Sequence, residues 1–172
     1  RLPDIYELVS LIDYNAYSPS IDGEAFPQTP GGVSFWSSSS SVSETDSSYS
    51  WAVNEHWAYH PSSSEWNSAR CVRGGPSLAR TFVPSMVGAE RIVTDSLFGL
   101  VWQGCAAGQS GEGCASGVAA AYNWKNALAY CEALSFGGYD DWRLPDIKEL
   151  SSLMDTRMVS PAIDGTAFPE TP

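Results

Sequence analysis

The four cysteines are the side chains with the most obvious chemical potential. They are Cys71, Cys105, Cys114 and Cys131. None lies in a C-x-x-C or C-x-x-C-H pattern, which removes the spacings of thioredoxin-like, zinc-ribbon and c-type haem sites. An even number without those spacings favours disulfides and an oxidising compartment, with four buried free thiols as the alternative. Cys105 and Cys114 flank a loop rich in Gly and Ser, so we expect them to form a bridge that stabilises the fold by roughly 2–3 kcal/mol.

Metal binding and catalysis have weaker support. His56 and His60 are four residues apart, which on a helix suits zinc. Their segment is typical of a strand or loop, where such residues lie about 13 Å apart. We therefore expect no metal and no cofactor, although a structural calcium remains an open alternative. Its oxygen ligands would come from Asp22, Glu44, Asp46, Asp140 and Asp141, which show no EF-hand spacing.

Motifs for nucleophilic or nucleotide chemistry are missing from the sequence. There is no G-x-S-x-G, no Ser–His–Asp order, no P-loop and no glycine-rich dinucleotide fingerprint. Arg143, beside Trp142, has two interpretations: an anion clamp, or a structural arginine that bridges carboxylates and loop carbonyls. We favour the structural role, because Arg1 stands in the same motif. The sequence thus predicts a protein that is not an enzyme.

The charge and the composition of the chain limit the classes of partner that it can bind. The formal net charge is −11, the pI is about 4.4, and the only lysines are Lys125 and Lys148. So acidic a surface repels phosphate backbones, which argues against nucleic acid and disfavours anionic membranes. No apolar run approaches the roughly 20 residues of a membrane helix, so we expect no membrane insertion. Little lysine with much Ser, Gly and Trp suits an extracellular or cell-surface protein.

Aromatic residues are abundant, with seven Trp and eight Tyr. Trp51, Trp57 and Trp66 lie near the Ser-rich segment 37–50, which we expect to be a flexible or turn-rich loop. Exposed rings stack on sugars without needing positive charge, so these three tryptophans are candidate glycan-binding residues. Their placement in the core is an equally good interpretation.

An internal repeat is the strongest signal. Residues 1–30 and 143–172 align without a gap and share 20 of 30 residues. The offset predicts a repeat unit of about 142 residues. We expect residues 1–75 to be the C-terminal part of one repeat, 76–90 a linker, and 91–172 the N-terminal part of the next. The chain would then be a fragment of a longer protein.

Local patterns predict short elements separated by long loops. Residues 122–134 show helical periodicity after the N-cap candidate Asn123. Capping boxes at Asp4 and Asp146 each open a further helix. We expect the apolar residues behind these boxes to face inward, namely Leu8, Leu11 and Ile12, and Leu150, Leu153 and Met154. Strand candidates are 33–36, 51–53, 91–94 and 99–103, which together indicate an α+β fold.

The motif order resembles a known bacterial family. The opening motif of that family is matched by Val93, Asp95 and residues 98–103. Its helix is matched by Trp124, Ala127, Tyr130 and Cys131, and its W-R-L-P motif by residues 142–145. Residues 21–22, 26–27, 36–38 and 70–74 match its later motifs. The chain therefore resembles the family that includes the C-terminal domain of the Legionella collagen-like adhesin, provided that it is read as parts of two adjoining repeats.

This resemblance implies a C-type-lectin-like domain with two short helices, short antiparallel strands, long loops and disulfides. It also implies that Cys131 pairs with the cysteine of a closing R-C-V-R-G motif. That partner is either a cysteine of the next repeat or Cys71. A bond between Cys71 and Cys131 would lie within this chain or join neighbouring chains. Family members are secreted or surface proteins, some of them adhesive. Formylglycine-generating enzymes share the architecture but need reactive cysteines.

Three functions follow in order of preference. The first is a non-catalytic extracellular repeat of a bacterial surface adhesin or filament, whose partners are neighbouring copies of itself or another surface protein. The second is a lectin-like module that binds glycan. The third is an enzyme of the formylglycine-generating type, which would need a free, titratable thiol.

Overall fold

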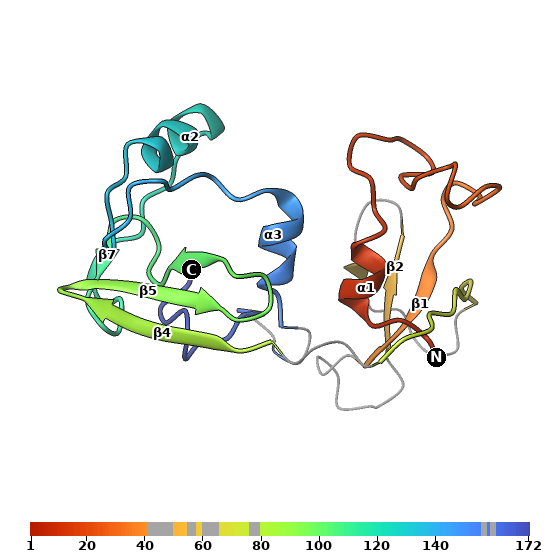
Figure 1. Cartoon of the computed structure of the whole chain (residues 1–172), viewed down its shortest axis with the longest axis horizontal. Helices are drawn as coiled ribbons and strands as arrows, with labels where there is room; N and C mark the ends of the chain where they lie inside the picture. The colour runs from red at the N-terminus through yellow and green to blue at the C-terminus, as the bar shows by residue number, and fades with distance from the viewer. Residues whose placement is uncertain (41–49, 55–57, 60–65, 76–79, 156–157, 159–160) are drawn as a thin grey trace. The chain divides into compact units, whose positions relative to one another are not determined.

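The computed structural model describes residues 1–40, 50–54, 58–59, 66–75, 80–155, 158 and 161–172. The chain divides into two compact units, which Figure 1 draws in full. Unit 1 comprises Arg1–Ser77 with Asp155–Val159, and unit 2 comprises Leu78–Met154 with Ser160–Pro172. Short helices, small antiparallel sheets and one disulfide confirm the predicted α+β, disulfide-stapled class. The finer likeness to C-type lectins stays a prediction.

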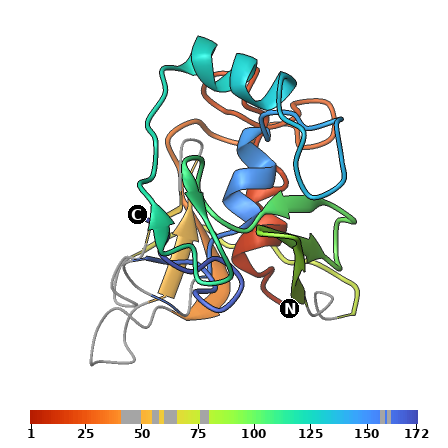
Figure 2. The ribbon, with the colours of Figure 1, turned by 90° about the vertical axis from the view of Figure 1, so that its left-hand side faces the viewer.

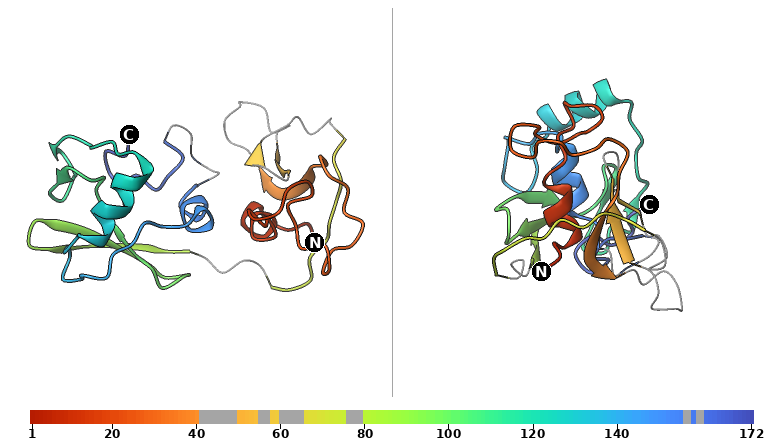
Figure 3. Two further views of the ribbon diagram at one scale, coloured as in Figure 1. Left: turned by 90° about the horizontal axis from the view of Figure 1, so that it is seen from above. Right: turned by 90° about the vertical axis from the view of Figure 1, so that its right-hand side faces the viewer.

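The described part of unit 1 is a short helix packed on a small sheet. Helix α1 (Ile5–Val9) lies against strands β1 (Phe35–Ser40) and β2 (Ser50–Val53), and β3 (Ala58–Tyr59) completes the antiparallel order β1-β2-β3. The right-hand panel of Figure 3 faces this unit. Ile5, Leu8 and Ile12 are buried together with Val53. Of the three residues predicted to face inward, Leu8 and Ile12 are buried and Leu11 is half-buried.

The Ser-rich segment corrects one prediction. Residues 37–40 belong to strand β1 rather than to a loop, and Ser37 is buried. Its hydroxyl donates to the carbonyl oxygen of Trp51 at 2.7 Å, which satisfies the polar group inside the unit. Local composition missed this strand because the partner lies 14 residues away. Residues 41–49 of the same segment lie outside the described part of the chain.

The residues of unit 2 that the structure describes form two small sheets and two helices. Strands β4 (Phe82–Val87), β5 (Glu90–Asp95) and β6 (Val101–Gln103) form one antiparallel sheet in that order. Strands β7 (Gln109–Ser110) and β8 (Ser116–Gly117) form the second. Helices α2 (Trp124–Glu132) and α3 (Ile147–Ser152) follow, and Figure 2, which faces this unit, shows α2 above α3.

Strand β4 occupies part of the segment 76–90. All six of its residues pair with β5, from Phe82 opposite Asp95 to Val87 opposite Glu90. Arg80, just before the strand, forms an ion pair with the fully buried Asp95 and also donates to the carbonyl oxygen of Ser152 at the end of α3. Its guanidinium lies over the ring of Phe82, 4.4 Å from the centroid. These contacts fix residues 80–90 to unit 2.

The helix starts agree with their sequence signals. The Asn123 side chain accepts from the backbone N–H of Asn126 at the start of α2. Asp4 and Asp146 form complete capping boxes with Glu7 and Glu149 at the starts of α1 and α3. Each cap satisfies backbone donors that short helices would otherwise leave unpaired.

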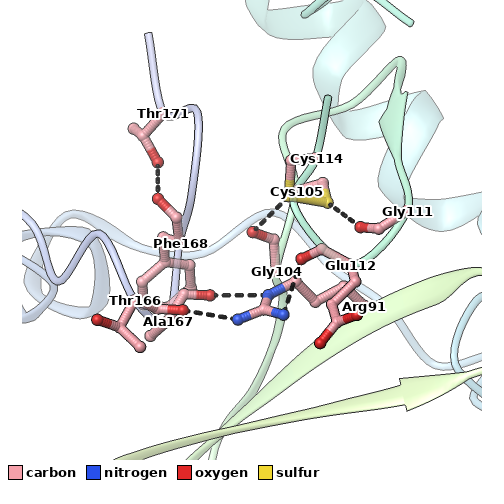
Figure 4. Close-up of a disulfide and its surroundings, with 10 residues drawn as sticks. All are labelled: Arg91, Gly104, Cys105, Gly111, Glu112, Cys114, Thr166, Ala167, Phe168 and Thr171. Carbon is pink, nitrogen blue, oxygen red and sulfur yellow. Dashed lines mark hydrogen bonds between the residues drawn. A yellow bond between two sulfur atoms is a disulfide. The ribbon is translucent and has the colours of Figure 1, made fainter. Parts of the chain in front are cut away.

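The disulfide closes a loop beside the core of unit 2 (Figure 4). Cys105 and Cys114 are bonded, which is the pairing expected from the loop between them. The buried side chain of Arg91 lies next to this loop and donates to the carbonyl oxygens of Glu112, Thr166 and Ala167 at 2.8, 2.6 and 3.2 Å. A Cβ on Gly104 would meet Arg91 Cγ at 2.5 Å, so only glycine fits beside this arginine.

Val93 of β5 is the centre of the unit 2 core. It is fully buried with Ala167 and Phe168 from the C-terminal segment. Phe82 meets Phe168 edge to face, with ring centroids 5.2 Å apart. The C-terminal segment is therefore part of the core. Arg91 anchors this segment by donating hydrogen bonds to the backbone carbonyl oxygens of Thr166 and Ala167.

Candidate functional site: an apolar groove in unit 2

Unit 2 contains a groove with a volume of about 630 Å³. Strand β6, helix α2, the chain between α2 and α3, helix α3 and the C-terminal segment contribute to its wall. Figure 1 shows how the chain from α2 to α3 arches above the β4–β5 hairpin. Most lining side chains are apolar or aromatic, which is typical of a surface that binds another apolar surface.

Tyrosine and tryptophan rings form one end of the groove. Tyr122 and Tyr130 stack with centroids 5.2 Å apart, and the Tyr130 hydroxyl accepts from Gln103 Nε2 at 3.1 Å. The Trp142 indole N–H donates to the carbonyl oxygen of Phe136 at 3.0 Å. Trp142 also meets the rings of Phe136 and Tyr139 edge to face. These contacts hold the rings in place, so the wall is preformed.

Arg143 and Glu149 supply paired charges to the lining. Both guanidinium NH₂ groups bind the carboxylate, at 2.7 and 2.5 Å. The hydrogen bond from Arg143 is the main reason why the pKa of Glu149 lies below its usual range, against the opposing effect of partial burial. The arginine is thus engaged by a carboxylate of α3, the helix that follows it, which agrees with the structural interpretation. Arg1 binds Glu7 in the same way.

Two cysteines carry free thiols in this structure. Cys131 lines the groove and is half-buried, whereas Cys71 is exposed. Burial raises the pKa of the Cys131 thiol. A reactive cysteine needs a lowered pKa, because the thiolate is the nucleophile. The environment of Cys131 therefore disfavours nucleophilic chemistry at this position.

The three candidate tryptophans have different environments. Trp51 is half-buried and packs against the core of unit 1, while Trp66 is fully exposed. Trp57 lies outside the described residues, as do His56, His60, Glu44 and Asp46. Among the residues that the structure describes, no cluster of three or more His, Cys, Asp or Glu side chains could hold a metal. Asp22 accepts from the backbone of its own turn, at Glu24 and Ala25.

The two copies of the repeated segment have the same local structure. Besides the capping boxes and the Arg–Glu pairs, both contain a turn built on an aspartate. Asp22 accepts from the backbone N–H of Ala25 at 3.1 Å, and Asp164 accepts from that of Ala167 at 3.1 Å. Both copies also place the residue before the final Thr-Pro in the left-handed region, with φ of 60° at Gln28 and 51° at Glu170. The 30-residue segment is therefore one structural motif that occurs twice.

The two copies bury opposite faces. On the first, Ile5, Leu8 and Ile12 are 1, 4 and 5% exposed beneath β1 and β2. Their counterparts on α3 are 49, 46 and 41% exposed, namely Ile147, Leu150 and Met154. The prediction that Leu150 and Met154 face inward is wrong, because no described strand covers this side of α3. Only Leu153 packs against the core of unit 2.

The other face of the segment shows the reverse pattern. Ala167 and Phe168 are buried against Val93 in unit 2. Their counterparts in unit 1 are Ala25, which is exposed, and Phe26, which is half-buried. The guanidinium of Arg70 lies over the Phe26 ring, 4.8 Å from its centroid. The motif thus has two apolar faces, and each copy uses a different one.

Arg80 and Arg91 are structural residues that the sequence did not reveal. Each binds partners 15 to 76 residues away, so no local spacing marks them. The available signal was indirect: Arg91 directly precedes the apolar pair Ile92 and Val93 in β5, where a buried, unpaired charge would be costly. Such a position requires several acceptors, which the C-terminal segment provides.

Comparison with known proteins gives one result. A family model described as the Lcl C-terminal domain matches residues 1–73 and 91–172. No curated protein and no solved structure matches the chain. The match falls in two parts, and the residues between them include strand β4.

Proposed function

Because the chain belongs to the family of Lcl C-terminal domains, we propose that it is a non-catalytic extracellular repeat module of a bacterial surface adhesin or filament. It acts through self-association or adhesion. The observation that carries this proposal is the two-part family match, which covers most of the chain. The family resemblance expected from the motif order is thereby confirmed.

The repeat organisation supports a modular role. We propose that residues 1–75 are the C-terminal part of one repeat and residues 91–172 the N-terminal part of the next, with residues 76–90 as the linker between them. The segment 1–30 recurs at 143–172 in sequence and in local structure. Tandem modules of this kind present the same surface many times, which increases the strength of weak attachments.

An extracellular or cell-surface location agrees with the covalent and electrostatic properties of the chain. The Cys105–Cys114 disulfide suits an oxidising compartment. The net charge of −11 keeps the modules soluble and separates them from phosphate-rich partners. Among the described residues, no helix is both long enough and apolar enough to cross a membrane.

Bead agglutination tests the adhesive role directly. Beads coated with the full chain should clump in proportion to coating density, and soluble chain should prevent clumping by competition. Beads coated with an unrelated protein of similar pI are the control for charge. Coated beads that neither clump nor attach to bacterial or host cell surfaces would contradict the proposal.

Glycan binding is the second candidate, because Trp66 is fully exposed and free to stack on a sugar ring. The change Trp66→Ala should abolish measurable affinity on a glycan panel, whereas Trp66→Tyr should retain part of it. The absence of binding by the unmodified chain across a broad panel would eliminate this candidate.

The enzymatic alternative depends on the two free thiols, Cys71 and Cys131. A formylglycine-generating activity would require one of them to be reactive and would convert a peptide cysteine to an aldehyde. We expect slow alkylation of Cys131, because burial raises the pKa of its thiol. We also expect no aldehyde product. Aldehyde formation that disappears on Cys131→Ser would restore the enzymatic interpretation.

A further inference from the structure

We propose that the Cys105–Cys114 disulfide is a redox-controlled latch for the C-terminal segment (residues 164–172). Reduction of the bond loosens that segment from the core of unit 2, and Arg91 transmits the change. This redox behaviour is separate from the proposed adhesive function. Its basis is that one buried arginine binds the disulfide ring (residues 105–114) and the C-terminal segment at the same time (Figure 4).

Arg91 is the structural link between the ring and the segment. Its guanidinium donates to the carbonyl oxygen of Glu112, inside the ring, at 2.8 Å. The same group donates to the carbonyl oxygens of Thr166 and Ala167 at 2.6 and 3.2 Å. Only 7% of Arg91 is exposed, so water does not readily replace a lost acceptor. The three acceptors together therefore hold the guanidinium in one position.

The disulfide keeps Glu112 opposite the arginine. Glu112 itself is exposed, whereas Cys105 and Cys114, which close the ring, are 5 and 0% exposed. Cleavage of the bond removes a covalent restraint two residues from Glu112. One contact opposes the release, because the backbone N–H of Gly111 donates to the carbonyl oxygen of Ala89 at 3.2 Å. This hydrogen bond joins neutral groups and leaves Glu112 a larger range of positions than the closed ring does.

Displacement of the Glu112 carbonyl weakens the hold on the C-terminal segment. It leaves an N–H group of Arg91 buried without its acceptor, which costs free energy. The guanidinium is planar and rigid, so a shift toward water moves its other donors away from the segment as well. Ala167 and Phe168 then keep their apolar contacts with Val93 but lose their anchor to β5. The segment therefore opens more often in the reduced chain.

The chemical step is a thiol–disulfide exchange with a small dithiol. The dithiol attacks one sulfur of the bond, forms a mixed disulfide, and leaves as its own cyclic disulfide. Each cysteine gains one electron and one proton and becomes a thiol, and the dithiol loses two electrons and two protons. In an oxidising compartment the bond forms again and the segment tightens. Unit 2 thus closes fully only in the kind of compartment that we propose for the chain.

Hydrogen exchange, followed residue by residue by NMR, tests the latch. The full chain carries Cys71→Ser and Cys131→Ser, so that only the disulfide of the ring responds to a reductant. The reporters are the backbone N–H groups of Ala167 and Phe168, which donate to Asp164 at 3.1 and 2.8 Å. Dithiothreitol should accelerate their exchange by about tenfold, the effect of one lost hydrogen bond from a charged donor. Unchanged exchange at both positions would overturn the proposal.

The chain contains a matched internal control. Ala25 and Phe26 occupy the same turn in the first copy of the motif, where their backbone N–H groups donate to Asp22 at 3.1 and 2.9 Å. They belong to unit 1, whereas the disulfide belongs to unit 2. Their exchange should be the same with and without dithiothreitol. Equal acceleration in both copies would reveal a general loss of stability and would rule out a latch.

The variant Arg91→Met tests whether the effect passes through the arginine. Exchange at Ala167 and Phe168 should be fast in this variant from the start, and dithiothreitol should change it by less than about twofold. The backbone N–H of Ala120 donates to the carbonyl oxygen of Ala107, inside the ring, at 2.7 Å. Its exchange should accelerate in both chains, which verifies that the ring has opened. An undiminished response at Ala167 in Arg91→Met would contradict the role of Arg91.

Arg91→Lys is the second variant, for the case in which Arg91→Met does not fold. Its ammonium keeps the charge but cannot span three acceptors, so the response of Ala167 and Phe168 to dithiothreitol should be smaller than in the chain with Arg91. A response of full size would overturn the proposal. The comparison of Ala167 with Ala25 needs no change at position 91 and is decisive without either variant.

Discussion

Leu8 and Leu150 hold the same position in two copies of one helix, yet Leu8 is 4% exposed and Leu150 is 46% exposed. The capping box, the Arg–Glu pair and the following turn are the same around both residues. The difference therefore arises from their neighbours, since β1 and β2 cover only the first helix. Local sequence determines the helix, and tertiary context determines which face it buries.

Truncation of these two leucines should have unequal effects on stability. Leu8→Ala should lower the free energy of unfolding of unit 1 by about 2–5 kcal/mol, because it leaves a cavity under the sheet. Leu150→Ala should change stability by less than about 0.5 kcal/mol at concentrations where the chain is monomeric. Urea titration followed by tryptophan fluorescence measures both. Equal losses would show that Leu150 is covered in solution.

Loss of the disulfide should destabilise unit 2. The bond spans a sequence separation of 9 residues, and the chain-entropy model gives roughly 2–3 kcal/mol for a loop of that size. Cys105→Ala with Cys114→Ala should lower the midpoint of thermal unfolding, and a reducing agent should have the same effect on the unmodified chain. Calorimetry measures the shift.

Cys71→Ser is the matched control, because Cys71 is exposed and carries a free thiol. It should leave the midpoint unchanged in oxidised and reduced samples alike. A reducing agent that leaves the unmodified chain at its original midpoint would show that the loop is ordered without its bond.

Asp95 should make unit 2 sensitive to acid. Burial acts to raise the pKa of its carboxyl, but the hydrogen bonds from Arg80 and from the backbone N–H groups of Leu97 and Phe98 outweigh burial and lower it. The resulting stabilisation is complete above the unfolded pKa of about 3.9 and is lost as pH falls through the lower folded pKa. Unfolding titrations between pH 6 and pH 2 should show stability falling at the acidic end.

Asp95→Asn should flatten that acidic decline and lower stability near neutral pH, because it leaves Arg80 without its carboxylate. Asp140→Asn, at an exposed position, is the matched control and should follow the unmodified chain. A decline of the same steepness in Asp95→Asn would assign the acid sensitivity to other groups, such as Glu7 or Glu149, whose pKa values are also lowered.

Arg91 should tolerate neither of its nearest replacements. Arg91→Met removes the donors to three carbonyl groups and should cost about 2–4 kcal/mol. Arg91→Lys keeps the charge, but its compact ammonium cannot span the three acceptors, so we expect only partial recovery. Hydrogen exchange at Ala167 and Phe168 should accelerate in both variants. Unchanged protection there would show that the C-terminal segment is held by apolar contacts alone.

Features that depend on neighbouring residues were predictable from the sequence. Asn123 caps a helix, Asp4 and Asp146 build capping boxes, and Cys105 pairs with Cys114 across a short loop. The strands near 51–53 and 91–94 also follow from apolar β-branched runs. For the caps and the disulfide, the interaction partners lie close along the chain, so residue types at fixed offsets carry the signal.

Features that depend on distant partners were not predictable. Strand β4 has mostly exposed side chains and a proline at position 84, so it lacks a strand pattern and is stabilised by pairing with β5. Ser37 lies in a strand that pairs with β2, and its hydroxyl donates a hydrogen bond to the carbonyl oxygen of Trp51 in that partner strand. The groove in unit 2 is missing from the sequence patterns because its walls come from segments up to 72 residues apart, from Gly99 to Thr171.

The bond between Cys105 and Cys114 has a further consequence for a protein exposed to proteases. Several residues between the two cysteines are exposed, among them Ser110, Glu112 and Gly113. Cleavage of a peptide bond inside this ring would leave both fragments covalently joined, because the sulfur bridge spans the cut. A nicked molecule would keep everything on either side of the loop attached, and its broken chain would become visible only after reduction.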